Sequence, residues 1–430
     1  MHRFIRRGAA AALPALLIVL GAGAALPVPA RAASTWSAPA PIPAGRFAEN
    51  AAGAQAVTWS SYNETTFLTS VEVSTSAKGL TWSAPVTLSI GEDAGPAPVV
   101  AVAPNGRVVV VWVGGPVTGP VVQSSVLPPG GTWSAPVNVS TDIYGDPVIG
   151  MDGSGNAIVT WLGGGREIRT ASLRASSTTW TAVNTLDSAL AGFALNMAVS
   201  SNGSVIVTWV ESLRTVWADS GTVLGGFAAP VTVDGVATSA ARNSGRPLQA
   251  TLDAYESPGL GGTPQVTLDA YFSGHTQVLL SNSGIAEMQW SAPGSTGTAI
   301  RSAAGAWSIQ AVPGSVAIDG AGDLLSVTQQ TSASGVTSVY TSKLPAGGST
   351  WSTPTALAVG SSPAEVGDTA GTFVIALDTA AGVSAYTSPP GGNFGAATTF
   401  PAVTVSGLTI VPGRAALLLS SGTVSTELVS

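Results

Sequence analysis

The chain has 430 residues, a formal net charge of −7 and no cysteine, and only 9% of its residues are charged. The lack of cysteine excludes disulfides, lipoprotein attachment and thiolate metal sites. The acidic balance argues against nucleic acid or an anionic membrane as partner, because both require a basic face.

Residues 1–32 have the pattern of an export signal. Three arginines lie among the first seven residues, residues 9–26 are apolar, and Ala30-Arg31-Ala32 fits a small-residue cleavage site. We expect cleavage near Ala33, no membrane span after it, and a secreted, extracellular protein, with general and twin-arginine export both open. Without the four arginines of this segment, 12 basic residues face 23 acidic ones, a net charge of −11.

A short phrase returns eight times along the rest of the chain. Three copies are Thr35-Trp36-Ser37-Ala38-Pro39, Thr81-Trp82-Ser83-Ala84-Pro85 and Thr132-Trp133-Ser134-Ala135-Pro136, and the others begin at Trp180, Phe227, Trp290, Trp351 and Phe394. The steps between copies run from 43 to 63 residues, a period typical of one four-stranded propeller blade. We therefore predict an all-β propeller of eight blades as a single domain over residues 33–430. Seven blades is the alternative, and the two longest steps place insertions within about 236–350.

The unit around residue 150 predicts how a blade is built. Residues 147–151 and 156–161 are extended and apolar, and the turn residues Asp152-Gly153-Ser154-Gly155 between them predict a β-hairpin. Residues 167–173 alternate as a third strand, and residues 179–183 open the fourth.

The end of the chain predicts how the propeller closes. Segments 408–411, 415–419 and 424–429 supply only three strands after the last copy of the phrase. The chain begins its repeats with a fourth strand, at Trp36. We expect this N-terminal strand to complete the last blade, because pairing there removes two open sheet edges.

Ten of the twelve tryptophans fall at repeated positions. Trp59, Trp112, Trp161 and Trp209 end the second strand of successive units, and six more lie in the repeated phrase. Recurrence in register predicts packing between blades rather than ligand contact. The two tryptophans outside this scheme are Trp217 and Trp307.

The segment Thr75-Ser76-Ala77-Lys78-Gly79-Leu80-Thr81-Trp82 resembles the Asp-box repeat of bacterial neuraminidases, S-x-D-x-G-x-T-W, with Ala77 in place of the Asp. The resemblance implies a sialidase-like propeller of secreted bacterial proteins with degenerate repeats, and it concerns blade construction rather than activity. Sialidases with this motif use an arginine triad, a Tyr nucleophile assisted by Glu, and an Asp acid. None of these residues can be matched to a position of this chain, so we assign no catalytic residue.

Metal and cofactor chemistry has little support in the sequence. The stretch from Asp152 to Asn156 holds too few carboxylates for a calcium loop. His275 is the one histidine after the leader, too few for a histidine metal site, and no phosphate-binding loop occurs. We expect no metal and no cofactor. Paired carboxylates for glycoside hydrolysis have no sequence signature, so that chemistry stays open.

Binding is the class of function that the sequence favours. The scarce charges concentrate in loops on one predicted face, and Trp217 lies near charged residues where a sister unit has Ser125. The candidate ligand-binding residues are Glu49, Asp93, Tyr144, Asp146, Arg214, Trp217, Arg242 and Arg246. We interpret the chain as a secreted, non-catalytic binding or scaffold module for glycan or extracellular protein. The alternative is a sialidase-like glycosidase or a polysaccharide lyase on the same fold.

Overall fold

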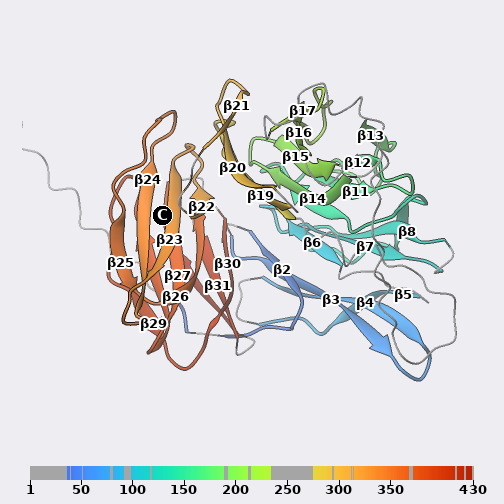
Figure 1. Ribbon diagram of the computed structural model, residues 1–430. Helices are drawn as coiled ribbons and strands as arrows, with labels where there is room; N and C mark the ends of the chain where they lie inside the picture. The colour runs from blue at the N-terminus through green and yellow to red at the C-terminus, as the bar shows by residue number, and fades with distance from the viewer. Residues whose placement is uncertain are drawn as a thin grey trace, which may run out of the picture. The chain divides into compact units, whose positions relative to one another are not determined.

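Short apolar runs separated by glycine turns pair into eight four-stranded antiparallel sheets in the computed structural model. The structure describes residues 36–38, 40–50, 52–77, 81–91, 98–116, 119–187, 192–211, 215–233, 275–292, 295–310, 312, 314–367, 371–411, 414–420 and 423–428. These residues contain no helix. The eight-bladed, all-β propeller expected from the repeat is confirmed (Figure 1).

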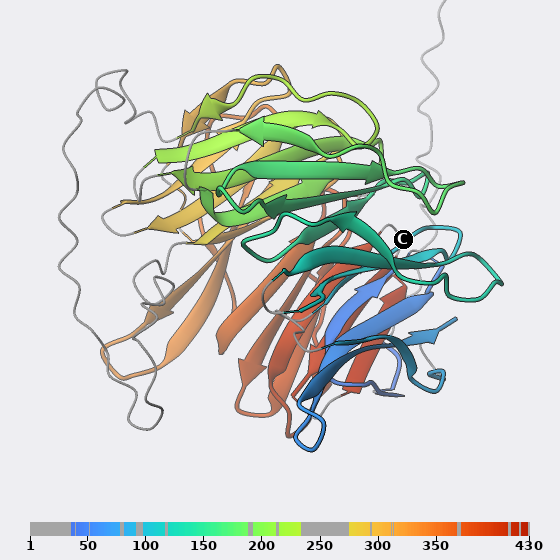
Figure 2. The same ribbon diagram turned by 90° about the vertical axis from the view of Figure 1, so that its right-hand side faces the viewer.

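Seven of the eight blades use four strands that are consecutive in the chain, and the colours of Figure 2 follow this order from blade to blade. The first blade contains β2 (Arg46–Glu49), β3 (Gln55–Asn63), β4 (Leu68–Ser76) and β5 (Val86–Gly91). The second contains β6 (Val99–Val102), β7 (Val108–Gly114), β8 (Val121–Leu127) and β9 (Val137–Ser140). The third contains β10 (Val148–Met151), β11 (Ala157–Leu162), β12 (Ile168–Leu173) and β13 (Asn184–Asp187). The fourth contains β14 (Gly192–Val199), β15 (Ser204–Glu211), β16 (Thr215–Thr222) and β17 (Val231–Thr232).

The remaining blades repeat this order. The fifth contains β18 (His275–Leu280), β19 (Ala286–Ala292), β20 (Ser295–Arg301) and β21 (Trp307–Ile309). The sixth contains β22 (Ser315–Ile318), β23 (Leu324–Thr331), β24 (Thr337–Leu344) and β25 (Thr355–Val359). The seventh contains β26 (Ser361–Gly367), β27 (Phe373–Thr379), β28 (Gly382–Ser388) and β29 (Thr398–Phe400). The eighth contains β30 (Val405–Val411), β31 (Arg414–Leu419), β32 (Thr423–Leu428) and, as its outer strand, β1 (Ala40–Pro41).

The N-terminal strand closes the last blade as expected. Ala40 pairs with Val424 and Pro41 with Thr423. Nearby, the rings of Trp36 and Phe400 meet edge to face, with centroids 5.9 Å apart. Trp36 therefore joins the two ends of the chain through an apolar contact as well as through the strand pairing.

Removing the closing strand should destabilise the whole protein. We compare a chain that begins at residue 43 with one that begins at residue 33. The shorter chain is expected to have a free energy of unfolding lower by roughly 2 kcal/mol, because it lacks the Trp36 contact and leaves β32 as an open edge. Urea denaturation followed by circular dichroism measures the difference. Equal midpoints for the two chains would show that β1 does not contribute to closure.

The second strands form the seams between blades. Val109 and Val111 of β7 pack with Trp161 of β11, and Ile158 of β11 packs with Trp209 of β15. Trp112, Trp161 and Trp209 are at most 1% exposed, which confirms that these three pack between blades. Trp59, at the same position of the first blade, is half-buried.

One tryptophan assignment from the repeated phrase was wrong. Trp290 does not open a fourth strand; it lies in β19, the second strand of the fifth blade, and packs in the seam with the fourth blade. Trp307 begins β21 and is the fourth-strand tryptophan of that blade. Trp290 was misassigned because the letters Trp-Ser-Ala also occur at the end of a buried second strand. In that strand Met288 and Trp290 lie on one buried face.

With Trp307 in the phrase, the repeat becomes more regular. Its distance to Trp351 is 44 residues, which is one blade. The long step now lies between Phe227 and Trp307, and it contains residues 234–274, which lie outside the described residues.

The hydroxyl residue that follows the tryptophan has the same structural role in four copies of the phrase. Its hydroxyl oxygen accepts an N–H of the third strand, and its own N–H donates to the carbonyl of that same residue. The pairs are Ser83 with Thr75, Ser134 with Val126, Thr181 with Ser172, and Ser352 with Lys343, at 2.8–3.1 Å. The phrase therefore fastens the fourth strand to the third and carries no reactive group.

The Asp-x-x-Gly-Asn stretch is a structural turn. Asp152 Oδ1 accepts hydrogen bonds from the backbone N–H groups of Ser154 and Asn156, each at 2.9 Å. Asp152 Oδ2 accepts one from Asn156 Nδ2 at 2.8 Å. Gly155 has a φ of 82°, which favours glycine. Both carboxylate oxygens of Asp152 are engaged within the turn, in line with a turn rather than a calcium loop.

Candidate functional site

The structure places four of the eight candidate ligand-binding residues, and they lie on three different blades. Glu49 is buried at the end of β2, where Gln55 Nε2 donates to its Oε2 at 3.1 Å. Tyr144 and Asp146 are exposed and share the loop between β9 and β10. The other four candidates, Asp93, Arg214, Arg242 and Arg246, lie outside the described residues.

Trp217 lies in β16, the third strand of the fourth blade, and its side chain is only 7% exposed. It is the cross-strand partner of Trp209 and packs with Ile168 of the third blade. Its indole therefore fills the seam between the third and fourth blades, and its role in ligand binding stays a prediction.

A cluster of ionic side chains surrounds Tyr144 on the third blade. Arg166 lies with its guanidinium carbon 4.6 Å from the centre of the Tyr144 ring, and its Nη2 donates to the tyrosine hydroxyl at 2.7 Å. Arg166 has a φ of 66°, an uncommon backbone conformation for a residue other than glycine. We call Asp142, Tyr144, Arg166, Glu167 and Arg169 the loop cluster.

The charges of the loop cluster are paired with one another. Arg169 Nη2 lies 2.6 Å from Asp142 Oδ2 and also pairs with Glu167. The hydrogen bond from Arg169 is the largest of the effects that lower the pKa of Glu167. Trp161 Nε1 donates to the Asp142 carbonyl oxygen at 2.9 Å, which ties the loop to the buried seam. Tyr144 is therefore the exposed member of the cluster, and the four charged residues are half-buried, with Arg169 joined to both acids.

Two glutamates of the fifth and seventh blades lie away from bulk water: Glu287 is buried and Glu365 is half-buried. Glu287 is 0% exposed, and its cross-strand neighbours are Leu279 and Ile300. Burial raises the pKa of Glu287 to about 8. A hydrogen bond with the Gln289 side chain lowers this pKa, and the charge of Glu365 raises it further. Burial likewise raises the pKa of Glu365 to about 7, against a hydrogen bond with Ser315. A sugar cannot reach the Glu287 carboxyl, so these two acids do not form an accessible hydrolytic pair.

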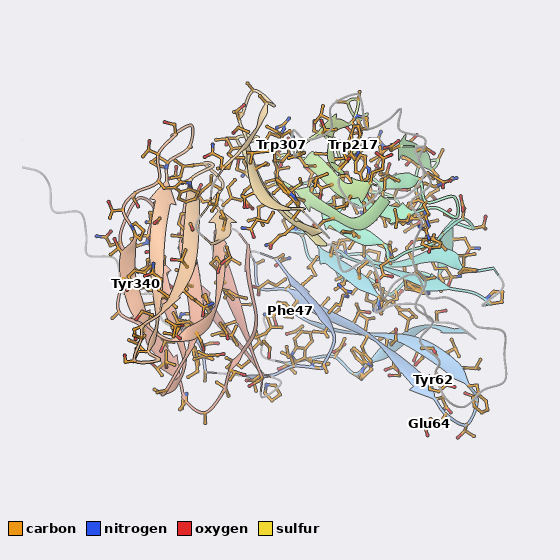
Figure 3. The ribbon with its side chains drawn as sticks, in the orientation of Figure 1. Phe47, Tyr62, Glu64, Trp217, Trp307 and Tyr340 are labelled. Atoms are coloured by element: carbon orange, nitrogen blue, oxygen red, sulfur yellow. The ribbon has the colours of Figure 1, made fainter. Side chains whose placement is uncertain are left out.

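A groove lies between the fourth and fifth blades, with a cavity volume of about 210 Å³. Ile206, Ala218 and Val231 of the fourth blade supply its apolar wall, and Ser220 adds a polar side chain. Arg301 and Trp307 of the fifth blade form the opposite wall. We call this the inter-blade groove; Figure 3 labels Trp307 in it and Trp217 on the neighbouring blade.

The sequence positions the two side chains of the fifth-blade wall together. Arg301 ends β20, Trp307 begins β21, and the two residues are cross-strand partners. The turn between them, Ser302–Ala306, is closed by a hydrogen bond from Ser302 N to Ala306 O at 2.9 Å. Cross-strand partners project from the same face of a sheet, so the Arg301 and Trp307 side chains both project toward the groove.

Asp219 also lines the groove, but its carboxylate lies on the other side of β16. Alternation along β16 directs Ala218 toward the fifth blade, where it packs with Met288, and Trp217 toward the third blade. Asp219 follows Trp217 by two residues and therefore faces the third blade. Its pKa is raised to about 6 by burial, with a contribution from the Asp187 charge of that blade. Arg301 is the charged side chain that faces the groove.

The sequence missed the groove for an identifiable reason. Trp307 was set aside as outside the repeat, although Ala306-Trp307-Ser308 matches the repeated phrase and lies one blade period before Trp351. Reading the phrase by spacing rather than by its letters alone would have found Trp307. Arg301 carries no such signal, since its importance depends on the fourth blade across the seam.

Within the described part of the chain, no three His, Asp or Glu side chains converge as metal ligands. Nor does any helix of these residues have the length and apolar character needed to cross a membrane.

No protein-family model and no curated protein matches this chain. Solved structures that resemble it include the BP39L lectin of Burkholderia pseudomallei, with 12% identity, 83% of this chain and 99% of that chain covered, and a TM-score of 0.44. The polysaccharide lyase Uly1 has 10% identity, with 77% and 89% covered and a TM-score of 0.43. A Hadza microbial sialidase has 12% identity, with 80% and 63% covered and a TM-score of 0.37. Identities and TM-scores this low do not indicate a shared activity.

Proposed function

We propose that this protein is a secreted, non-catalytic β-propeller that binds glycans, with the inter-blade groove as its sugar site. The observation that carries the proposal is the half-buried Trp307 ring beside an apolar wall and an adjacent guanidinium. A sugar ring has an apolar face and a rim of hydroxyls, so it needs an aromatic surface next to hydrogen-bonding groups. The groove offers both within one cavity.

The size of the groove supports a small ligand unit. Its volume of about 210 Å³ lies below the usual range for drug-sized ligands, roughly 300–1,000 Å³. A single sugar unit of a longer chain matches such a space, and the rest of the glycan then extends into solvent.

Secretion is supported by the first 32 residues and by the composition. A basic start, an apolar stretch and a small-residue cleavage site precede the propeller. The chain has no cysteine, so the fold depends on packing and on the β1 closure rather than on disulfides.

Replacing Trp307 should weaken sugar binding. Trp307→Ala is expected to lower the affinity about tenfold, because the aromatic surface of the groove is removed. A glycan array with native protein identifies the bound sugars, and isothermal titration calorimetry then compares native protein with the variant.

Trp351→Ala is the matched control. Trp351 holds the same fourth-strand position in the sixth blade and is also half-buried against an apolar cluster. This variant should retain native affinity while losing comparable packing. If Trp307→Ala and Trp351→Ala bind sugars equally well, or if native protein binds none, the proposed site is wrong.

A further inference from the structure

We infer that the sugar unit taken by the inter-blade groove carries a carboxylate, as a uronic acid does, and that Arg301 binds it. This inference rests on the proposed glycan-binding function and specifies its ligand class. It follows from the hydrogen bond that holds Arg301, from the lack of an acidic partner among the described residues, and from Trp307 on the same wall of the groove.

A hydrogen bond holds Arg301 at the wall of the groove. Its Nη1 donates to the carbonyl oxygen of Gly284, in the turn between β18 and β19, at 2.8 Å. Its cross-strand partners are Ala286 and Trp307, so its side chain faces the fourth blade. Burial lowers the pKa of Arg301, which shows that part of the hydration of this cation has been removed.

Arg301 has no acidic partner among the described residues, whose ion pairs are those of Arg169 with Asp142 and Glu167. Asp219, the acid on the opposite strand, faces the third blade. A guanidinium that has lost hydration without gaining an anion retains unused capacity to bind one.

The other buried basic residues differ from Arg301 in this respect. Arg107 is 2% exposed and donates to three carbonyl oxygens, those of Gly155, Arg174 and Ser177. Lys343 donates to Ser388 Oγ and to the Gly392 carbonyl oxygen, and its charge interacts with nearby acids. Both serve to join blades. Arg301 makes one hydrogen bond among the described residues and lines a cavity.

Gly305 keeps the space around the guanidinium open. Its φ is 94°, and a Cβ atom built there would lie 3.2 Å from Arg301 Nη2. A side chain at this position would be strained by the backbone and would crowd the guanidinium. The turn between β20 and β21 therefore leaves Arg301 accessible from the groove.

A carboxylate fits this arrangement. The planar guanidinium presents parallel N–H donors that match the two oxygens of a carboxylate, and Trp307 beside it offers a flat surface for the sugar ring. The acidic chain, with a net charge of −7, has no general attraction for anions. Selectivity for an acidic sugar must therefore come from the local cation.

The test compares sugars that differ only in charge. Native protein is titrated calorimetrically with a glucuronate-containing oligosaccharide, its neutral glucose counterpart and a sulfated counterpart. The same titrations are made with Arg301→Gln, with Arg301→Lys, and with Arg46→Gln as the control, since Arg46 is exposed on the first blade. Circular dichroism verifies that each variant is folded.

We expect native protein and Arg46→Gln to prefer the glucuronate ligand over the neutral one about tenfold or more. Arg301→Gln should lose this preference but keep the weaker, Trp307-dependent binding of the neutral sugar, and Arg301→Lys should restore only part of the preference. Equal native binding of the acidic and neutral ligands overturns the carboxylate inference and leaves the proposed function standing. Equal or better binding of the sulfated ligand also overturns it. Binding of none of the three overturns both.

Discussion

Trp161→Ala is expected to lower the free energy of unfolding by about 3–5 kcal/mol, because the indole is fully buried between the second and third blades. The deletion leaves a cavity beside Val109 and Val111 of β7, and the neighbouring strands cannot collapse into it without breaking their pairing. The variant also removes the donor to the Asp142 carbonyl oxygen. Urea denaturation followed by far-ultraviolet circular dichroism measures the change.

Trp59→Ala provides the comparison, since Trp59 holds the same strand position in the first blade but is only half-buried. Its cost should be clearly smaller. If Trp161→Ala keeps native stability and instead loses glycan binding, the interpretation of the seam tryptophans as packing residues is wrong.

Glu287→Gln is expected to stabilise the protein at pH 7 by about 3 kcal/mol. The reason is that the Glu287 carboxyl has a pKa of about 8 in the folded protein against 4.5 in its ordinary state. The folded state therefore holds a proton at pH 7 that the unfolded state releases. The free energy of unfolding of the native protein falls as the pH rises from about 4.5 toward 8, and an amide at this position removes that loss.

The sign of the pH dependence is the decisive measurement. The stabilisation by Glu287→Gln should be near zero at pH 4, where the carboxyl is protonated in both states, and should grow up to pH 8. Glu64→Gln, at an exposed turn of the first blade that Figure 3 labels, removes the same charge and should show no such trend. A stabilisation by Glu287→Gln that does not change between pH 4 and pH 8 contradicts the assignment.

Much of the fold could be predicted from the sequence because its determinants are local. The Asp152 turn, the apolar second strands and the hydroxyl after the tryptophan of the phrase act within one blade, so their recurrence predicts similar sheets. The closing strand could also be predicted, because three strands at the end of the chain require a fourth from elsewhere.

The candidate site could not be predicted in the same way. The groove depends on Ala218 and Val231 facing Arg301 and Trp307 across a seam between two blades. The spacing of residues within one blade does not predict which residues of two blades face each other. Trp217 shows the same limit: its large side chain among charged residues favours a ligand contact, which stays a prediction, and the structure packs the indole against Ile168 of the third blade. For such residues the sequence pattern predicts which strand holds the residue, but the side chain's surroundings depend on the neighbouring blade.

The pairing of β1 with β32 also has a consequence for how the protein folds. Ala40 and Val424 are 384 positions apart, yet they are partners in one sheet. Inner blades can assemble from consecutive strands as soon as each appears, but this contact requires the entropy of closing a loop of nearly the whole chain. We therefore expect closure to be the last step of folding, and a partly assembled propeller to expose the edge of β32 to other chains until it occurs.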